Sequence, residues 1–271
     1  MTEISRKQPC PCGSGKRYKN CCRKLEKSPL VGKVIGSVFD HKNKQVVTYT
    51  DDMLVNQVKR DSSKIAFSFD KLCDEHLKEI SKLISIVSML VSYSLKELSD
   101  ENHQLELACL ELLANALNSF TASTTLLRDG YRLQPGILIR NIIETMSTVL
   151  HLFIHQGDLS KFREGRLESP DTIAAARKVL PIFGRLYGFF SKEFAHLGTL
   201  HQSLQPLIPY TKFDDALSNN ISFLRLTSLL MYTQRGSEWT FQKQIKMLLK
   251  MLSSNVPSVV KSKPPNRAEY I

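Results

Sequence analysis

Residues 135–156 read PGILIRNIIETMSTVLHLFIHQ, and this apolar stretch decides the class of fold. Its large apolar side chains recur every three or four residues, which is the spacing of one helix face. Pro135 and Gly136 suit the first turn of a helix, and Gly157 can supply its C-terminal cap. The stretch therefore predicts a helix that is apolar enough to lie at the centre of a helical domain.

The same helical spacing continues on both sides of this stretch. It predicts one long helix from residue 70 to about 98 and a second that begins at about 105 and ends near Asp129–Gly130, with Ser99–Asn102 as the break between them. Further helices are expected at 158–165, 171–179, 181–197, 211–234 and 238–254. We therefore expect a multi-helix bundle over residues 70–254, followed by a flexible tail at 255–271.

The segment before the bundle has a different pattern. Residues 34–39 and 45–49 are rich in β-branched and aromatic side chains, and the polar residues 40–44 separate them. This order is typical of a β-hairpin. Residues 61–64 are polar and predict a loop. We expect residues 29–69 to be a connector that holds this hairpin.

Four of the six cysteines, namely Cys10, Cys12, Cys21 and Cys22, fall within thirteen residues near the start of the chain. Such a dense cluster in an intracellular chain is more often a metal site than a disulfide framework. Four thiolates suit tetrahedral Zn²⁺ and leave no open position, so we expect one structural zinc ion. Gly13 and Gly15 would let the backbone turn so that both cysteine pairs converge. The isolated Cys73 and Cys109 are expected to be buried.

The thirteen residues CPCGSGKRYKNCC at 10–22 resemble the SEC-C motif, a zinc knuckle that also occurs at the C-terminus of the SecA translocase. The family often has His where this chain has Cys22. The resemblance implies a knuckle over residues 1–28 that docks on a ribosome, RNA or an acidic protein surface. The expected contacts are the nearby cations Lys16, Arg17, Lys19, Arg23 and Lys24.

The formal net charge of the 271 residues is +11, and much of it lies near the knuckle. Residues 1–33 hold nine Lys and Arg side chains against two acidic ones. No stretch approaches eighteen uninterrupted apolar residues, and the first residues lack the apolar core of a signal peptide, so we expect a cytoplasmic protein without a transmembrane helix. The G-x-S-x-G and G-x-G-x-x-G patterns are absent, which leaves serine-hydrolase and dinucleotide-binding functions without support.

A polar stripe runs along the otherwise apolar helix at 137–156. On a helical wheel the members fall on the side opposite the apolar face, and they are Arg140, Glu144, Ser147, His151 and His155. One interpretation is the solvated face of an amphipathic helix. The other is a polar site between helices, in which Arg140, Glu144 and the later His196 act as catalytic residues.

Several segments of the bundle are also similar to bacterial helical proteins that carry SEC-C knuckles. Residues 126–130, 139–144, 187–191 and His196 carry this resemblance, which extends distantly to HEPN domains. HEPN domains include RNase toxins and defence proteins, but their signature of Arg, four residues and then His is absent. Three hypotheses therefore stay open. The first is a binding protein whose knuckle docks on a partner while the helical domain carries a second interaction, the second is an RNase-like effector, and the third is a homodimer whose bundle presents two knuckles.

Overall fold

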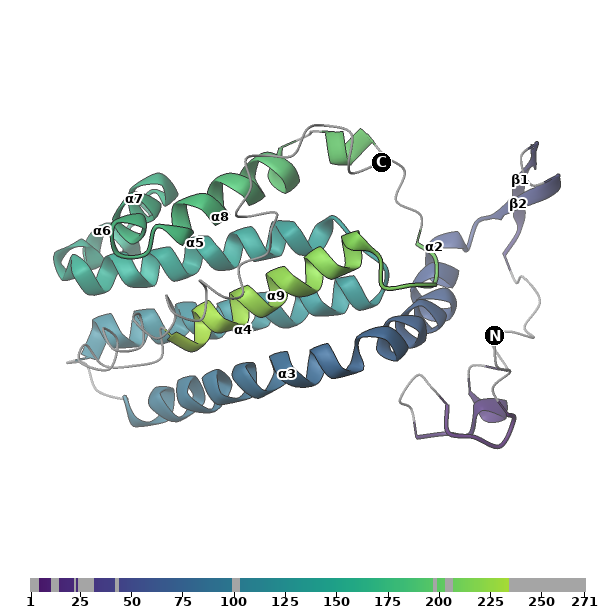
Figure 1. Ribbon diagram of the computed structural model, residues 1–271, viewed down its shortest axis with the longest axis horizontal. Coiled ribbons are helices and arrows are strands. Elements are labelled where there is room, and N and C mark those ends of the chain that lie inside the picture. Colours follow the sequence, from purple (N-terminus) through teal and green to yellow (C-terminus); the bar gives the residue numbers. More distant parts are fainter. Residues whose placement is uncertain are drawn as a thin grey trace. The chain divides into compact units, whose positions relative to one another are not determined.

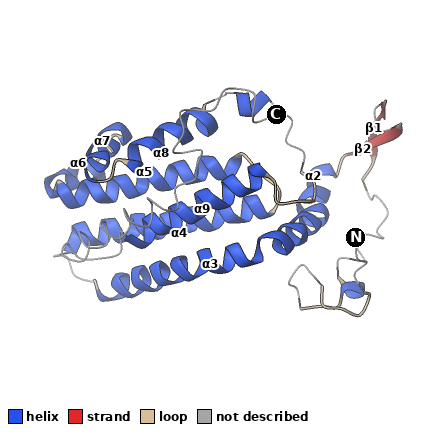
Figure 2. Ribbon diagram, in the orientation of Figure 1, coloured by secondary structure: helices blue, strands red, loops and turns tan. Residues whose placement is uncertain are grey.

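The computed structural model describes residues 5–10, 15–21, 23, 32–41, 44–98, 103–196, 199–202 and 207–233. Within these ranges the chain is mainly helical and contains one two-stranded antiparallel sheet, so the predicted fold class is confirmed (Figures 1 and 2). The described residues form two compact units. One takes its residues from 1–72, 128–130 and 207–212, and the other takes its residues from 73–127, 131–206 and 213–271.

The predicted hairpin in the first unit is confirmed. Strand β1 covers Val34–Asp40 and strand β2 covers Gln45–Thr50, with Val38 opposite Val47. Lys44 has a φ of 53°, the left-handed conformation that the tight turn between the strands requires. A bulge interrupts β1 between Val34 and Gly36. The base of the hairpin is tied to the next segment by the Thr50 hydroxyl, which donates to the Asp52 carboxylate at 2.6 Å.

The loop predicted at 61–64 is wrong, because the chain is helical there. Helix α2 covers Met53–Asn56, a π-helical turn covers Gln57–Asp61, and helix α3 begins at Ser62 and runs to Glu97. The Ser62 hydroxyl donates to the Val58 carbonyl at 2.6 Å, so its hydrogen-bonding capacity is satisfied inside the helix.

The first turns of α3 form the core of this unit. Ile65 and Phe69 are fully buried, and the Phe69 ring lies 5.6 Å from the ring of Tyr210. The Tyr210 N–H donates to the Ser68 hydroxyl at 2.8 Å. Gly130 approaches Ile65 closely at a φ of +95°, a conformation that side chains other than glycine rarely adopt. The segments around 130 and 210 are therefore held against α3 by direct packing.

The second unit is a helical bundle whose elements agree with most of the sequence prediction. Beyond α3 they are α4 (Gln104–Arg128), α5 (Gln134–Ile154), α6 (Leu159–Arg163), α7 (Ser169–Val179), α8 (Ile182–Phe190), a π-helical turn (Ser191–Ala195) and α9 (Asp215–Thr233). The break predicted at 99–102, the helix predicted at 238–254 and the predicted tail lie outside the described residues.

Helix α5 is the central element of the bundle. It lies beside α7, α8 and α9 in Figure 1 and packs against all three. Its side chains Ile139, Ile142 and Met146 have no exposed surface. By length and composition alone α5 could also cross a membrane, but a buried core helix meets the same criterion. The sequence predicts no transmembrane helix, because no stretch approaches eighteen uninterrupted apolar residues. The burial of α5 inside the bundle explains its composition.

The predicted C-terminal cap of α5 is wrong. The helix ends at Ile154, and the N–H of the capping residue His155 donates to the His151 carbonyl at 2.8 Å. Gly157 instead belongs to a 3₁₀ turn over Gln156–Asp158, and it lacks the positive φ that a glycine cap would require.

Candidate functional site

The predicted knuckle begins with a closed backbone loop. Pro9 and Arg17 form an antiparallel bridge, and the Cys10 N–H donates to the Lys16 carbonyl at 2.7 Å. Gly15 has a φ of +68°, so it supplies the left-handed turn that the glycine-rich sequence predicts. Gly13 lies outside the described residues. The loop therefore returns on itself over residues 9–17.

Two of the four predicted metal ligands lie in this described segment. The Cys10 side chain is buried, and the half-buried Cys21 directly follows the 3₁₀ turn Tyr18–Asn20. Cys12 and Cys22 are outside the described residues, and the described part of the chain holds no cluster of three or more metal-ligating side chains. The thiol donors and the closed loop fit a soft ion such as Zn²⁺. In that site Cys10, Cys12, Cys21 and Cys22 would hold the ion, which would cross-link both ends of the loop.

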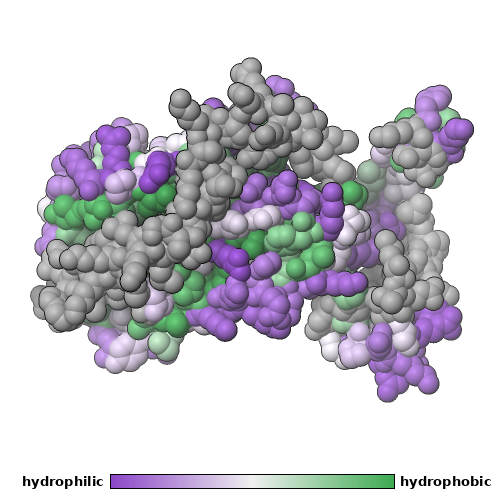
Figure 3. All heavy atoms as spheres, in the orientation of Figure 1, coloured by the Kyte–Doolittle hydropathy of each residue, from purple (hydrophilic) through white to green (hydrophobic). Residues whose placement is uncertain are grey.

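The predicted docking residues around this loop are accessible. Lys16, Arg17 and Lys19 are exposed and Arg23 is half-buried, while Lys24 lies outside the described residues. The described residues of this region are largely hydrophilic on the face shown in Figure 3. Lys16, Arg17 and Lys19 therefore give the described part of the loop an exposed positive charge.

A second candidate site forms where α5 faces α8 and the π-helical turn. The Arg140 guanidinium pairs with Glu144 at 3.0 Å and donates to the Ser191 hydroxyl at 2.9 Å and to the Tyr187 hydroxyl at 3.2 Å. It also lies 5.0 Å from the centre of the Tyr187 ring. The side chains of Arg140 and Glu144 are 27% and 17% exposed. The structure therefore brings two of the three predicted catalytic residues into one partly buried polar cluster.

The π-helical turn in this cluster rests on aromatic packing. Rings of α8, the turn and α9 contact one another at centroid distances of 4.9–6.0 Å, and they belong to Phe189, Phe190, Phe194 and Phe223. Single π-helical turns occur often at functional sites, because the extra residue re-aims the side chains of the turn. Here the turn begins at Ser191, which accepts the hydrogen bond from Arg140.

The third predicted catalytic residue, His196, directly follows this π-helical turn. Its N–H donates to the Ser191 carbonyl at 3.1 Å, and its side chain is exposed. Among the described residues the structure gives no hydrogen bond or ion pair to the His196 ring. His196 is therefore joined to the cluster through the backbone of the turn rather than through a side-chain contact with Arg140 or Glu144.

The interpretation of the polar stripe as a solvated helix face is wrong for most of its members. Ser147 is fully buried, and His151 is only 6% exposed. Nε2 of His151 lies 2.9 Å from the Asp158 carboxylate, and the His151 ring is 4.8 Å from the ring of His155. Only His155 is exposed as that interpretation requires. The 3₁₀ turn after α5 covers this part of the stripe by bringing Asp158 back to it.

The partners of Arg140 in the polar cluster were not predicted from the sequence. Tyr187 and Ser191 are separated from it by 47 and 51 residues, so no local spacing predicts these contacts. The two isolated cysteines are buried as expected, with Cys73 at 0% and Cys109 at 2% exposure. Burial raises the pKa of the Cys109 thiol to about 12, which keeps it protonated and unreactive.

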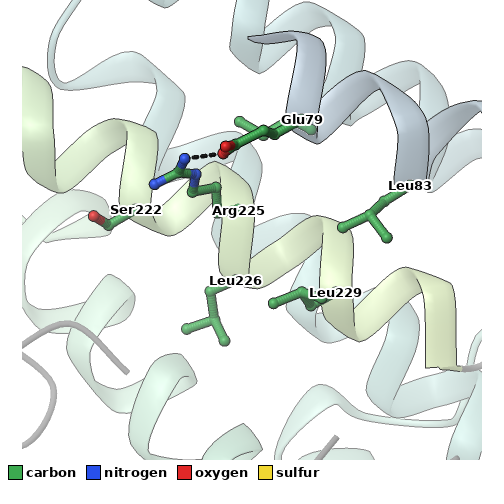
Figure 4. A pocket seen from close by; sticks show the side chains of 7 residues that line it. Glu79, Leu83, Ser222, Arg225, Leu226 and Leu229 are labelled. Atoms are coloured by element: carbon green, nitrogen blue, oxygen red, sulfur yellow. Dashed lines mark hydrogen bonds and ion pairs between the residues drawn. The ribbon is translucent and has the colours of Figure 1, made fainter. Parts of the chain in front are cut away.

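A cavity of about 330 Å³ between α3 and α9 was also not predicted (Figure 4). Its apolar lining includes Leu83, Leu226 and Leu229. At its polar side Arg225 pairs with Glu79 and also lies 3.2 Å from His76. Because these charges satisfy one another, the Arg225–Glu79 pair leaves no unpaired charge at the cavity that would indicate an ionic ligand.

The comparisons with known proteins support the knuckle alone. The SEC-C motif model matches residues 6–24. The SecA translocase subunit of Dichelobacter nodosus is 67% identical over 24 residues, which are 9% of this chain and 3% of SecA. The SecA subunit of Wolinella succinogenes is 75% identical over 20 residues, which are 7% of this chain and 2% of SecA. The chain thus spans a very small part of these relatives, and no solved structure matches it.

Proposed function

We propose that residues 6–24 form a zinc knuckle that docks this protein on an anionic macromolecular surface in the cytoplasm. The SEC-C match over these residues carries the proposal. The closed loop around Cys10 and the exposed Lys16, Arg17 and Lys19 support it. Such cations are attracted to the phosphates of a ribosome or RNA, or to the carboxylates of an acidic protein.

Crosslinking in cells tests whether the knuckle selects the partner. RNA and protein crosslinked to the wild type are compared with those recovered with a Cys21→Ser/Cys22→Ser double variant, which removes two zinc ligands. We expect the partners to be lost, and unchanged partners would contradict the docking role. Cys109→Ala is the matched control, because this buried thiol lies in α4, away from the motif in sequence. Elemental analysis of the purified protein should show one zinc per chain.

The charge of the knuckle is tested separately from its fold. Replacing Lys16, Arg17 and Lys19 together with Ala should weaken binding to the recovered partner and lower its dependence on salt concentration. The control replaces the same number of exposed cations in the bundle, namely Lys82, Arg177 and Lys178. Equal losses of affinity in both triple variants would show that the knuckle provides no specific surface.

The polar cluster at Arg140 supports a second candidate function, a divergent HEPN-like RNase effector. A partly buried guanidinium beside Glu144, with His196 on the adjoining turn, has the residue types that phosphate binding and proton transfer need. RNA cleavage by the purified protein should then be lost in Arg140→Ala and in His196→Ala. It should persist in Arg185→Ala and His155→Ala, which change exposed residues of α8 and of the α5 terminus. Cleavage that survives the first two substitutions would exclude these roles.

A further inference from the structure

Exposed apolar side chains concentrate on the first unit, from β1 to the π-helical turn after α2. Of the eighteen large apolar side chains that are exposed in the described chain, ten lie in this stretch. We call them the apolar arm: Val34, Ile35, Val38, Phe39, Val46, Tyr49, Met53, Leu54, Val55 and Val58. A surface of this kind is rare on a monomer and marks an interaction site.

The hairpin of the apolar arm is exposed on both faces. Cross-strand neighbours point to the same face, so Val38 and Val47 share one face while Phe39 and Val46 share the other. Val38, Phe39 and Val46 are 57%, 49% and 64% exposed, and green spheres at the hairpin are visible at the right of Figure 3. An isolated two-stranded sheet is marginally stable in water, because it buries too little apolar surface. Within the described part of the chain, this hairpin is therefore without the apolar cover that a partner would supply.

The sheet of the described residues has two strands, so no third strand pairs with the outer edge of β2 there. Edge strands usually carry Lys, Pro or a bulge that prevents pairing with another strand. The edge of β1 has such a bulge, between Val34 and Gly36. In contrast, β2 reads QVVTYT over Gln45–Thr50, without a charge, proline, glycine or bulge. New strand pairing is thus expected at β2.

The absence of charged residues in β2 indicates which partner fits. A nucleic acid, a lipid headgroup or a charged protein would call for charges that Gln45–Thr50 lacks. The β2 strand of a second copy needs no such charges. Antiparallel pairing about a two-fold axis would join the strand to its own copy. We propose that the apolar arm is a homodimer interface in which β2 pairs antiparallel with β2 of a second copy of this chain. The proposal is independent of what the knuckle binds.

Sedimentation equilibrium of the full zinc-loaded chain tests the proposal. We expect the wild type to have twice the mass of one chain at micromolar concentration. Val46→Lys and Leu54→Lys should each shift the protein toward the monomer and raise the dissociation constant of the dimer at least tenfold. Both side chains are largely exposed, at 64% and 76%, so the variants should keep the helical circular dichroism of the wild type.

Met89→Lys is the matched control. Met89 is 61% exposed on α3, outside the apolar arm, so this variant should stay dimeric. A wild type that is monomeric throughout, or a dimer that survives both arm substitutions, would overturn the proposal. Hydrogen exchange adds a second reading, since β2 amides should be protected in the dimer and exchange faster in the Val46→Lys monomer. Protected β2 amides in a monomeric wild type would instead indicate that another segment of the same chain binds the apolar arm.

Discussion

Gly136, in the first turn of α5, is the position where one added methyl group has the clearest predicted cost. A Cβ there would collide with the Phe194 ring, and Phe194 is held among Phe189 and Phe190. We therefore expect Gly136→Ala to lower the free energy of unfolding by about 1–3 kcal/mol, as overpacking does elsewhere. Urea denaturation followed by circular dichroism measures this change.

Gly188 supplies the control for this substitution. It also lies in a helix, α8, but a Cβ there would meet no atom within 4 Å. Gly188→Ala should raise the free energy of unfolding by up to about 1 kcal/mol, because alanine loses less backbone entropy in a helix. If both variants change stability in the same direction, the close approach of Phe194 does not control position 136.

The six cysteines should separate into two classes by reactivity. Cys73 and Cys109 are buried, and burial raises the pKa of Cys109 to about 12, so neither should react with a disulfide reagent at pH 8 before unfolding. The four cysteines of the motif should become reactive when a chelator removes zinc. The measurement is the number of thiols titrated in native, chelated and denatured protein. Reaction of Cys109 in the native protein would contradict its burial.

At the scale of elements, the turn after α5 should make stability depend on acid pH. Hydrogen bonds from Lys161 and then His151 lower the pKa of Asp158 below its usual 3.8. A carboxyl whose pKa is lower in the folded state stabilises the fold above 3.8 and loses that contribution as pH falls through the folded pKa. Asp158→Asn should therefore lower the urea midpoint at pH 7 and have a smaller effect below pH 3.8.

Glu111→Gln is the control, since it removes one exposed carboxylate from α4 where no ion pair is described. It should shift the midpoint little at either pH. An equal shift by Asp158→Asn at pH 7 and below pH 3.8 would show that the effect of the side chain is not electrostatic.

Elements with strong local signals could be predicted from the sequence, whereas their ends and contacts could not. The long run of α5 and the β-branched strands carry their periodicity in adjacent residues. Ser62 and Ser63 have weak helix propensity, yet they are helical because α3 packs through Ile65 and Phe69. His151 lies on the polar side of its own helix but is buried by the turn that follows. A helical wheel represents a single helix, so it cannot show that a side chain is buried by another segment of the chain.

The same limit applies to the candidate sites. The knuckle could be identified because its cysteines, glycines and cations are close together in the sequence. In the polar cluster, the Arg140–Glu144 pair follows from helical spacing, but the hydroxyls of Tyr187 and Ser191 come from another helix and turn. Their position depends on how α8 packs on α5, which no local pattern encodes.

At the scale of the whole molecule, zinc and the bundle should be separable. The buried side chains of α4, α5, α8 and α9 belong to the second unit, which takes none of its residues from 1–72. Short zinc modules depend on their ion for most of their folding free energy, about 10–16 kcal/mol. Chelation should therefore unfold the knuckle while the helical circular dichroism and the thermal midpoint of the bundle stay within experimental error.

This expectation is checked by heating the full chain with and without chelator, with Cys21→Ser/Cys22→Ser as the genetic equivalent of zinc loss. Both treatments should remove partner binding and leave the bundle transition in place. If the knuckle only stabilised the bundle, loss of zinc would lower the thermal midpoint of the bundle. A large fall in this midpoint would therefore contradict a docking role. An unchanged midpoint with lost binding would show that the ion serves recognition, since the buried contacts of the bundle already suffice to hold its helices together.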